Sequence, residues 1–151
     1  MVSIIEYEER YSADFKRMNI EWLEKYGLLE PPDLLVLNNP KGAILDAGGY
    51  IFLAVVDGVV AGSSALQKEH DGVYELAKMA VRPAFQGKGI SKLLMEKCLE
   101  KAKQLQAKTV LLYSNSQLQT AIRLYEKYGF VHVPVTDSPF VTADVKMSLT
   151  L

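Results

Sequence analysis

The stretch from Val81 to Ser91, VRPAFQGKGIS, joins two segments of different periodicity and constrains the fold more than any other part of the chain. The run that leads up to Val81 is apolar and partly β-branched, as in a strand. After the stretch, apolar residues recur at helical spacing from Ile90 to Leu105, with lysines and glutamates on the other side. Gly87-Lys88-Gly89 separates the two. The sequence therefore predicts a strand, a glycine turn and an amphipathic helix in direct succession.

A glycine turn between a strand and a helix is typical of a phosphate site. Glycine lets the backbone approach a ligand closely, and the N–H groups of the first helical turn face an anion. A lone Gly-x-Gly can also serve turn geometry alone. Two nucleotide motifs do not fit, because Lys92 stands where the dinucleotide fingerprint needs its third glycine and Gly89 where the Walker A loop needs Ser or Thr.

The rest of the chain predicts one α/β domain over residues 1–151. The Asp57-Gly58 pair is the strongest hairpin signal, and a second turn at His70-Asp71-Gly72 extends it to an antiparallel meander. The run Thr109–Tyr113 favours a buried strand in a parallel pair, which makes one strand-helix-strand crossover. The expected strands are Val2–Glu6, Tyr50–Val56, Val59–Leu66, Val73–Val81, Thr109–Tyr113, Val131–Val135 and Ala143–Leu149; the expected helices run from Ser12 to near Gly27, over Leu34–Leu37, from Ile90 to Leu105 and from Leu118 toward Gly129, with a loop over Pro40–Gly49.

Charge and cysteine content exclude several classes of function. With 17 basic and 18 acidic residues, the chain has no overall charge that would favour nucleic acid or an anionic membrane surface. No apolar run approaches the roughly 18 to 20 residues of a membrane-spanning helix. A single cysteine, Cys98, and an early charged N-terminus make the cytoplasm the expected location. His70, His132 and Cys98 are too few to suggest a zinc cluster.

Three segments in order resemble one family. The run Gln86-Gly87-Lys88-Gly89-Ile90-Ser91 is similar to the R/Q-x-x-G-x-G/A acyl-CoA-binding loop of the GCN5-related N-acetyltransferase (GNAT) superfamily, with Ser91 where Gly or Ala is usual. Residues 75–83, ELAKMAVRP, resemble its fourth strand, and residues 121–130, AIRLYEKYGF, its A-x-x-LYEK-x-GF segment. The resemblance covers roughly residues 50–151 well, and it implies a mixed, mostly antiparallel sheet of about seven strands flanked by helices, with a cofactor-binding core at about 73–130.

The resemblance also implies an activity, the transfer of an acetyl group from acetyl-CoA to a primary amine of a small molecule or peptide. By this resemblance, the backbone of Met79 and Val81 pairs with the pantetheine arm of acetyl-CoA, and Tyr125 protonates the leaving thiolate. The pyrophosphate is expected to contact Gln86, Gly87, Lys88, Gly89, Ile90 and Ser91. A bulge on the fourth strand would free an N–H for the thioester carbonyl. Without the family context, the helical spacing of Tyr125 favours core packing.

Glu75 is the leading candidate for the general base that removes a proton from the amine. Strict alternation places it with Ala77, Met79 and Val81 on one face of the strand, although a bulge would change the phase. Glu75 as a solvated residue or a partner of Lys78 is the competing interpretation. His70 and His132 are weaker base candidates, more typical of a turn and a strand residue, and Cys98 lies on the apolar helix face, which favours a core position.

The acceptor amine is expected to bind near Trp22, Tyr26 and the segment from Val133 to Phe140, although the spacing of Trp22 also fits core packing. No metal ligand set is predicted. A homodimer through the C-terminal strands is consistent with the family resemblance. The alternative hypothesis is an acetyl-CoA-binding sensor or interaction module of the same fold without turnover.

Overall fold

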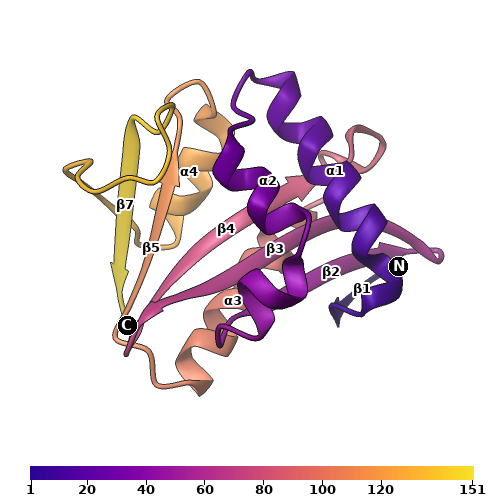
Figure 1. Cartoon of the computed structure of the whole chain (residues 1–151), viewed down its shortest axis with the longest axis horizontal. Helices are drawn as coiled ribbons and strands as arrows, with labels where there is room; N and C mark the ends of the chain where they lie inside the picture. The colour runs from indigo at the N-terminus through magenta and orange to yellow at the C-terminus, as the bar shows by residue number, and fades with distance from the viewer.

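A seven-stranded sheet in the order β1-β2-β3-β4-β5-β7-β6 runs through the protein, and the computed structural model describes all of residues 1–151 (Figure 1). Neighbouring strands are antiparallel except β4 and β5, which are joined by the crossover through α3. This confirms the predicted α/β class and the central strand-helix-strand unit. The strands are β1 (Val2–Glu6), β2 (Tyr50–Val56), β3 (Val59–His70), β4 (Val73–Val81), β5 (Thr109–Ser114), β6 (Val131–Val133) and β7 (Val145–Thr150), and the α-helices are α1 (Ser12–Lys25), α2 (Pro31–Leu37), α3 (Ile90–Gln104) and α4 (Gln119–Lys127).

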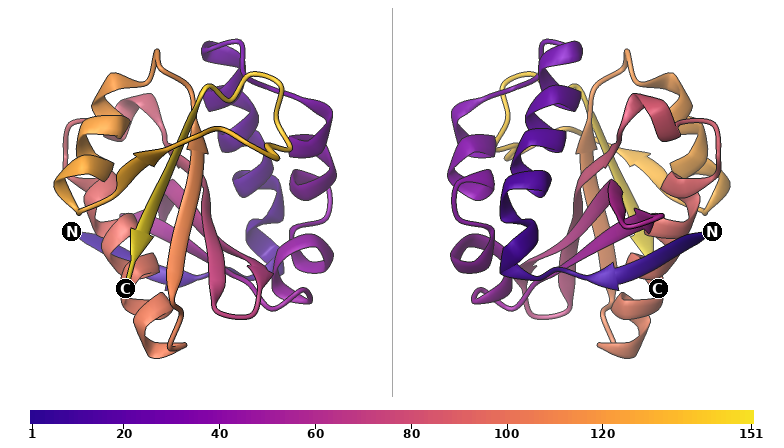
Figure 2. Two further views of the ribbon diagram at one scale, coloured as in Figure 1. Left: turned by 90° about the vertical axis from the view of Figure 1, so that its left-hand side faces the viewer. Right: turned by 90° about the vertical axis from the view of Figure 1, so that its right-hand side faces the viewer.

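Helices cover both faces of the sheet, with α1 and α2 on one face and α3 and α4 on the other (Figure 2). The side chains of β2 show how one strand serves both layers. Ile51 and Leu53 pack into the cluster that contains Phe15 of α1, whereas Phe52 and Ala54, on the opposite face, pack into the cluster of α3 and α4. A strand buried on both faces therefore reads as a continuous apolar run.

The predicted hairpin forms at Asp57-Gly58, where both residues have positive φ, 48° and 78°. Such a pair of angles matches the twist of two-residue hairpin turns. The following strand, β3, is longer than predicted and continues to His70, because the turn at Asp71-Gly72 closes the next hairpin only there. The meander was thus predicted correctly in order and too short in length.

Strands β4 and β5 separate soon after they meet. Their parallel pairing covers only Val73 to Glu75 against Thr109 to Leu111. Beyond this point β4 continues to Val81 and β5 to Ser114 without pairing to each other. The sheet therefore opens into a V between its two central strands, which the views of Figure 2 show between β4 and β5.

A β-bulge interrupts β4 at Lys78. Ala77 pairs with Ala65 of β3, but the next pair is Ala80 with Ser63, so Lys78 and Met79 lie opposite the single residue Ser64. Lys78 has a φ of 51°, which costs an ordinary residue about 1 kcal/mol and requires support from its surroundings. The bulge changes the phase of the strand. Strict alternation is therefore wrong here, because Val81 packs with Leu76 in the cluster of α3 and α4.

Two further expectations need correction. The segment Pro40–Gly49 is not a plain loop, because Lys41–Leu45 forms a wide helical turn that buries Ile44 in the core cluster that also contains Phe15 of α1. Its glycines and small residues concealed this apolar anchor. In addition, α2 begins at Pro31 rather than Leu34, since proline is well tolerated in a first helical turn. None of the helices combines the length and apolar character that crossing a membrane requires.

Candidate active site

A cleft of about 670 Å³ occupies the opening between β4 and β5. One side is formed by the end of β4, the glycine turn, the start of α3 and the inner face of α4. The other side is formed by α1, the start of α2 and the connection between β6 and β7. The cleft therefore passes from one helical layer to the other through the gap in the sheet.

The glycine turn forms one end of this cleft with its backbone amides free. Gly87 and Gly89 have φ values of 77° and 76°, and an added Cβ at either would meet nothing within 4 Å. The N–H groups from Gly87 to Lys92 make no hydrogen bond within the chain. Open space in front of unpaired amides at the start of a helix is the arrangement that binds a phosphate. The residues present thus fit a pyrophosphate.

The side chains around the turn differ in whether they line the cleft. Gln86 lies in the cleft wall, but its amide nitrogen donates to the Val81 carbonyl at 3.2 Å, which fixes the turn to the strand. Ser91 and Lys92 also line the cleft. Lys88 does not line the cleft, and its ammonium lies 5.7 Å from the centre of the Phe85 ring. Of the predicted contacts in this loop, Lys88 is the one that the structure places outside the cleft wall.

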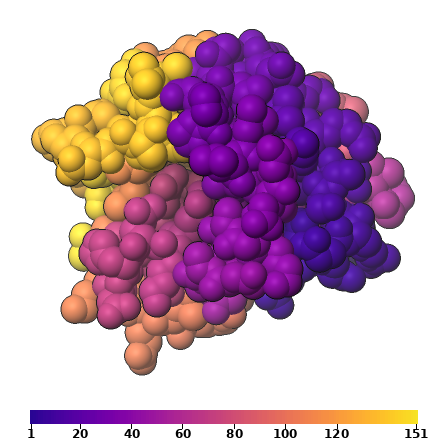
Figure 3. All heavy atoms as spheres, in the orientation of Figure 1, coloured from indigo at the N-terminus to yellow at the C-terminus, as the bar shows by residue number.

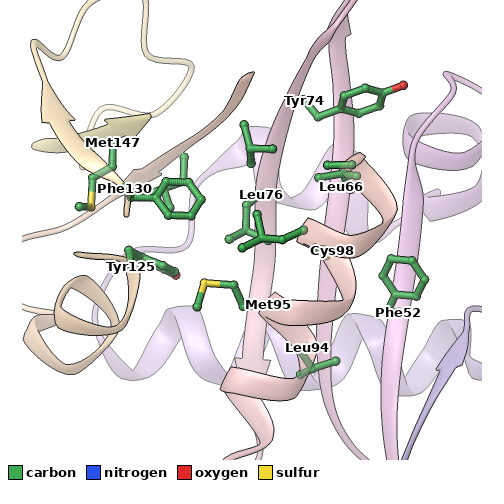
Figure 4. Packing of buried hydrophobic residues seen from close by; sticks show 14 of the residues in the cluster. Phe52, Leu66, Tyr74, Leu76, Leu94, Met95, Cys98, Tyr125, Phe130 and Met147 are labelled. Carbon is green, nitrogen blue, oxygen red and sulfur yellow. The ribbon is translucent and has the colours of Figure 1, made fainter. Parts of the chain in front are cut away.

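Tyr125 of α4 lies in the wall of the cleft with its ring in the core. Its ring packs against Phe130 at a centroid distance of 6.0 Å, and only 8% of the residue is exposed (Figure 4). The hydroxyl makes no hydrogen bond within the chain. Every side-chain oxygen in the protein that lacks a hydrogen-bond partner keeps some exposed surface, and this applies to the Tyr125 hydroxyl as well. The hydroxyl therefore reaches the cleft. Burial raises the pKa of Tyr125 to about 12, which keeps the phenol protonated near neutral pH.

Glu75 lies where the two strands begin to separate. The residue is only 6% exposed, which excludes the solvated position considered from the sequence. Burial, followed by a hydrogen bond and charge repulsion from Glu69, raises the pKa of Glu75 to about 8. A carboxyl group with a pKa near neutrality can exchange protons with an amine at ordinary pH.

The Lys78 side chain forms its ion pair with α2, although its charge also acts on Glu75 and offsets part of the rise in that pKa. Its ammonium lies 2.6 Å from a carboxylate oxygen of Asp33, and the two side chains are 5% and 4% exposed. Asp33 also accepts a hydrogen bond from the backbone N–H of Glu30 at 2.9 Å, which caps α2. The carboxylate thus holds both the helix start and the bulge.

A polar relay supports the bulge from α1. Asn19 donates its amide hydrogen atoms to the Phe15 carbonyl at 2.9 Å and to the Ser63 hydroxyl oxygen at 3.0 Å. Ser63 in turn donates to the Lys78 carbonyl at 2.7 Å. This satisfies a carbonyl that the bulge has turned out of the strand ladder.

Glu30 is hydrogen-bonded to the connection between β6 and β7, over the cleft. Its carboxylate accepts hydrogen bonds from the N–H groups of Val141 at 2.8 Å and Thr142 at 3.0 Å, and from the Thr142 hydroxyl. Burial raises the pKa of Glu30, but the bonds from Thr142 and Val141 outweigh it and leave that pKa below its ordinary value. In Figure 3 the yellow atoms of this connection abut the purple atoms that precede α2.

Comparison with known proteins assigns this architecture. The sequence profile of the Acetyltransferase (GNAT) family matches residues 9–130. The chain belongs to the GNAT acetyltransferase family. Acetyl-CoA is the co-substrate of this family, and solved GNAT structures similar to this chain contain coenzyme A or acetyl-CoA.

Individual relatives agree with the family assignment. N-acetylaspartate synthetase from Xenopus tropicalis is 37% identical over 95 residues, which cover 62% of this GNAT chain and 35% of the relative. The chain thus spans about a third of the length of the curated relatives that match first. The uncharacterized N-acetyltransferase YvbK from Bacillus subtilis is 33% identical over 101 residues, 65% of each chain.

Solved structures confirm the fold of this GNAT-family chain. A GNAT-family acetyltransferase from Staphylococcus aureus superposes with a TM-score of 0.91 at 20% identity, covering 99% of both chains. The PaiA N-acetyltransferase from Thermoplasma acidophilum, in complex with coenzyme A, has a TM-score of 0.81 at 16% identity and covers 100% of this chain and 99% of its own.

The cleft of this GNAT protein brings together most of the residues that the sequence singled out. Lining the cleft are Glu75, Met79, Val81, Gln86, Gly87, Gly89, Ile90, Ser91 and Tyr125, together with Trp22, Tyr26 and Phe140 on the acceptor side. His70 and His132 lie elsewhere, and the His132 ring is 3.1 Å from the Glu126 carboxylate at the surface. Cys98 is fully buried and 3.2 Å from the Ser64 hydroxyl, which confirms its core position. No group of side chains suited to holding a metal ion was found.

Sequence reasoning missed the polar residues from the first helices. Asn19, Glu30 and Asp33 reach the cleft or its rim, but they follow no family motif and contact partners far along the chain. A lysine at position 78, within an otherwise apolar strand, was the one available signal. The sequence offered a pair of Lys78 with Glu75 only as the competing interpretation of Glu75, and the salt bridge of Lys78 is with Asp33.

Proposed function

We propose that the protein moves an acetyl group from acetyl-CoA to a primary amine of a small molecule or peptide, by direct attack in a ternary complex. The observation that carries this proposal is the presence of three kinds of group in the wall of one cleft: free amides at the glycine turn, the Tyr125 hydroxyl, and the buried Glu75 carboxyl at the strand separation. These are the groups that hold an anion, donate a proton and accept one.

The glycine turn and the end of β4 bind the co-substrate. The amides from Gly87 to Lys92 receive the pyrophosphate, and the backbone of Met79 and Val81 pairs with the extended arm where β5 no longer competes for it. The bulge at Lys78 interrupts the ladder with β3, and an N–H that it frees would serve the thioester carbonyl. The cofactor-binding core therefore extends over about residues 73–130.

Glu75 and Tyr125 handle the two protons of the reaction. Glu75 in its ionised form removes a proton from the acceptor amine, directly or through water, so that the nitrogen lone pair can attack the carbonyl. Tyr125 donates its hydroxyl proton to the sulfur as the carbon–sulfur bond breaks. A thiol has a pKa of about 8.5, so the phenol gives up its proton only as charge develops on sulfur.

The acceptor side of the cleft remains to be matched to an amine. The vertebrate relatives are named N-acetylaspartate synthetase, which describes aspartate as an acceptor, but the chain spans about a third of their length. A cytoplasmic location and a homodimer through the C-terminal strands stay predictions.

Calorimetric titration with acetyl-CoA tests the proposal, with NAD and ATP as controls, followed by thiol release with a panel of primary amines. Micromolar or tighter binding of acetyl-CoA alone, and amine-dependent thiol release, would support it. Binding of acetyl-CoA without release by any amine or peptide amino terminus would favour the sensor or interaction module. Absence of acetyl-CoA binding would overturn both.

A further inference from the structure

The acceptor side of the cleft is walled by aromatic rings. Trp22 and Tyr26 of α1 pack against each other at a centroid distance of 5.1 Å. Across the opening, Tyr113 at the end of β5 packs against Phe140 of the β6–β7 connection at 6.5 Å. All four residues line the cleft. Such walls suit an acceptor with an apolar or aromatic body.

The charges on this side are distributed unevenly. Lys78 is the single basic residue among the lining residues of the acceptor side, and its ammonium is already paired with Asp33 at 2.6 Å. Asp33 and Glu75 supply two carboxyl groups there. The other basic residues of the cleft, Lys92, Arg123 and Lys127, belong to α3 and α4 on the opposite face of the sheet.

Asn19 adds a directional group. Because the Phe15 carbonyl can only accept, the Asn19 nitrogen must face it, which directs the amide oxygen elsewhere. This oxygen has no hydrogen-bond partner in the chain, although the residue as a whole is buried. Because every side-chain oxygen without a partner keeps some exposed surface, the Asn19 oxygen does so too. A buried acceptor that still reaches the cleft is a suitable partner for an N–H donor.

We propose that the acceptor is a primary amine on an apolar or aromatic body that carries no carboxylate beside the amine. This inference rests on the proposed function and specifies its substrate class. An amine entering the cleft meets the Glu75 carboxyl, the Asn19 oxygen and the aromatic faces, which accept an N–H donor or attract a cation, while the Asp33 charge is already compensated by Lys78. A carboxylate entering with it meets the Glu75 carboxyl and no unpaired cation on the acceptor side, so it is desolvated without a partner.

Matched acceptor pairs that differ only in the carboxylate test this proposal. We would measure kcat/KM for thiol release from acetyl-CoA with phenethylamine against L-phenylalanine, and with tyramine against L-tyrosine. We expect the amines to be preferred by at least about 100-fold, because a site that leaves a buried polar group unpaired rejects its bearer strongly. Equal values, or a preference for the amino acids, would overturn the inference alone.

The outcomes separate this inference from the proposed function. If acetyl-CoA binds but neither member of either pair releases thiol, while an amine with a polar body or a carboxylate beside the amine does, the substrate class is wrong and the acetyltransferase activity stands. If acetyl-CoA does not bind, the proposed function fails and the inference with it.

A variant tests the role of the ion pair in this selectivity. Asp33→Asn leaves Lys78 without its partner and offers a cation to an incoming carboxylate. The ratio of kcat/KM for phenethylamine to kcat/KM for L-phenylalanine should therefore fall by at least about 10-fold, because kcat/KM for the amino acid rises. Asp46→Asn is the matched control, because Asp46 pairs with Lys41 at the surface outside the cleft. A folded Asp33→Asn protein, judged by its thermal unfolding, with an unchanged ratio would contradict the assigned role of Lys78.

Discussion

The ammonium of Lys78 and the carboxylate of Asp33 lie 2.6 Å apart and nearly fully buried, so a single ion pair ties the bulge of β4 to the first turn of α2. Removing one member of a buried pair leaves the other charge without compensation, which typically costs about 3 to 5 kcal/mol. We expect Lys78→Met to lower the free energy of unfolding by about 3 kcal/mol, as measured by urea denaturation.

The double variant Lys78→Met/Asp33→Asn should lose less stability than the sum of the two single variants, since neither charge then remains unpaired. Lys41→Met is the surface control: the Lys41 and Asp46 side chains are 60% and 59% exposed, and such pairs contribute about 0 to 1 kcal/mol. Strictly additive effects in the double variant would argue against a coupled pair.

Substitution in the glycine turn should lower the affinity for acetyl-CoA by more than its effect on stability explains. Gly87→Ala and Gly58→Ala both place a side chain on a positive φ, at 77° and 78°, and neither added Cβ meets another atom. Each should therefore cost about 1 kcal/mol of stability through backbone strain. Only Gly87→Ala should weaken acetyl-CoA binding, by at least about 10-fold in calorimetry. Equal affinity in the two variants would remove the turn from the binding site.

Tyr125→Phe tests the proton donor. We expect kcat to fall by about 100-fold or more, the usual range for a general acid, while the affinity for acetyl-CoA changes little. Tyr128→Phe is the matched control on the same helical segment, because its hydroxyl donates to Glu96 at 2.6 Å outside the cleft. Full turnover by Tyr125→Phe, under conditions where chemistry limits the rate, would show that the tyrosine only fills the core.

Glu75 predicts a pH dependence of activity. A base with a pKa of about 8 must lose its proton to act, so kcat/KM should rise with pH up to about 8 and level off above it. Glu69→Gln should move this rise to lower pH, since the Glu69 hydrogen bond and charge help raise the pKa of Glu75. Glu75→Gln should abolish the rise together with most of the activity. A rise that survives in Glu75→Gln would assign it to another group.

The same pKa has a consequence for stability. The folded protein holds the Glu75 proton more tightly than the unfolded chain does, because the pKa is raised from 4.5 to about 8. The stabilisation of the folded state that comes from this tighter proton binding is fully present below about pH 4.5 and is lost as the pH rises through 8. The Glu75→Gln variant should therefore have a melting temperature a few degrees above that of the wild type at pH 9. The difference between the two melting temperatures should be smaller at pH 5. A melting difference that is independent of pH would contradict a buried, titrating Glu75.

The sequence predicted the elements that depend on local signals. Asp57-Gly58 and the helical spacing after Ile90 each act within a few residues, and the glycine turn sits within a motif of the family. What the sequence could not give are contacts between distant segments. Lys78 and Asp33 are separated by 45 positions, and Glu30 meets Thr142 across 112. The bulge belongs to this second class, because its positive φ at Lys78 depends on Ser63 and Asp33 rather than on its neighbours along β4.

The short pairing of β4 with β5 also bears on aggregation. Where two strands part, each exposes a row of backbone hydrogen-bonding groups, and such edges on the outside of a protein recruit strands from other molecules. Here the edges beyond Glu75 and Leu111 face each other inside the fold, between helices on both sides of the sheet. A foreign polypeptide strand would have to displace those helices to reach them, whereas a slender molecule can enter through the cleft. The fold thus retains unpaired strand edges without presenting them to its neighbours.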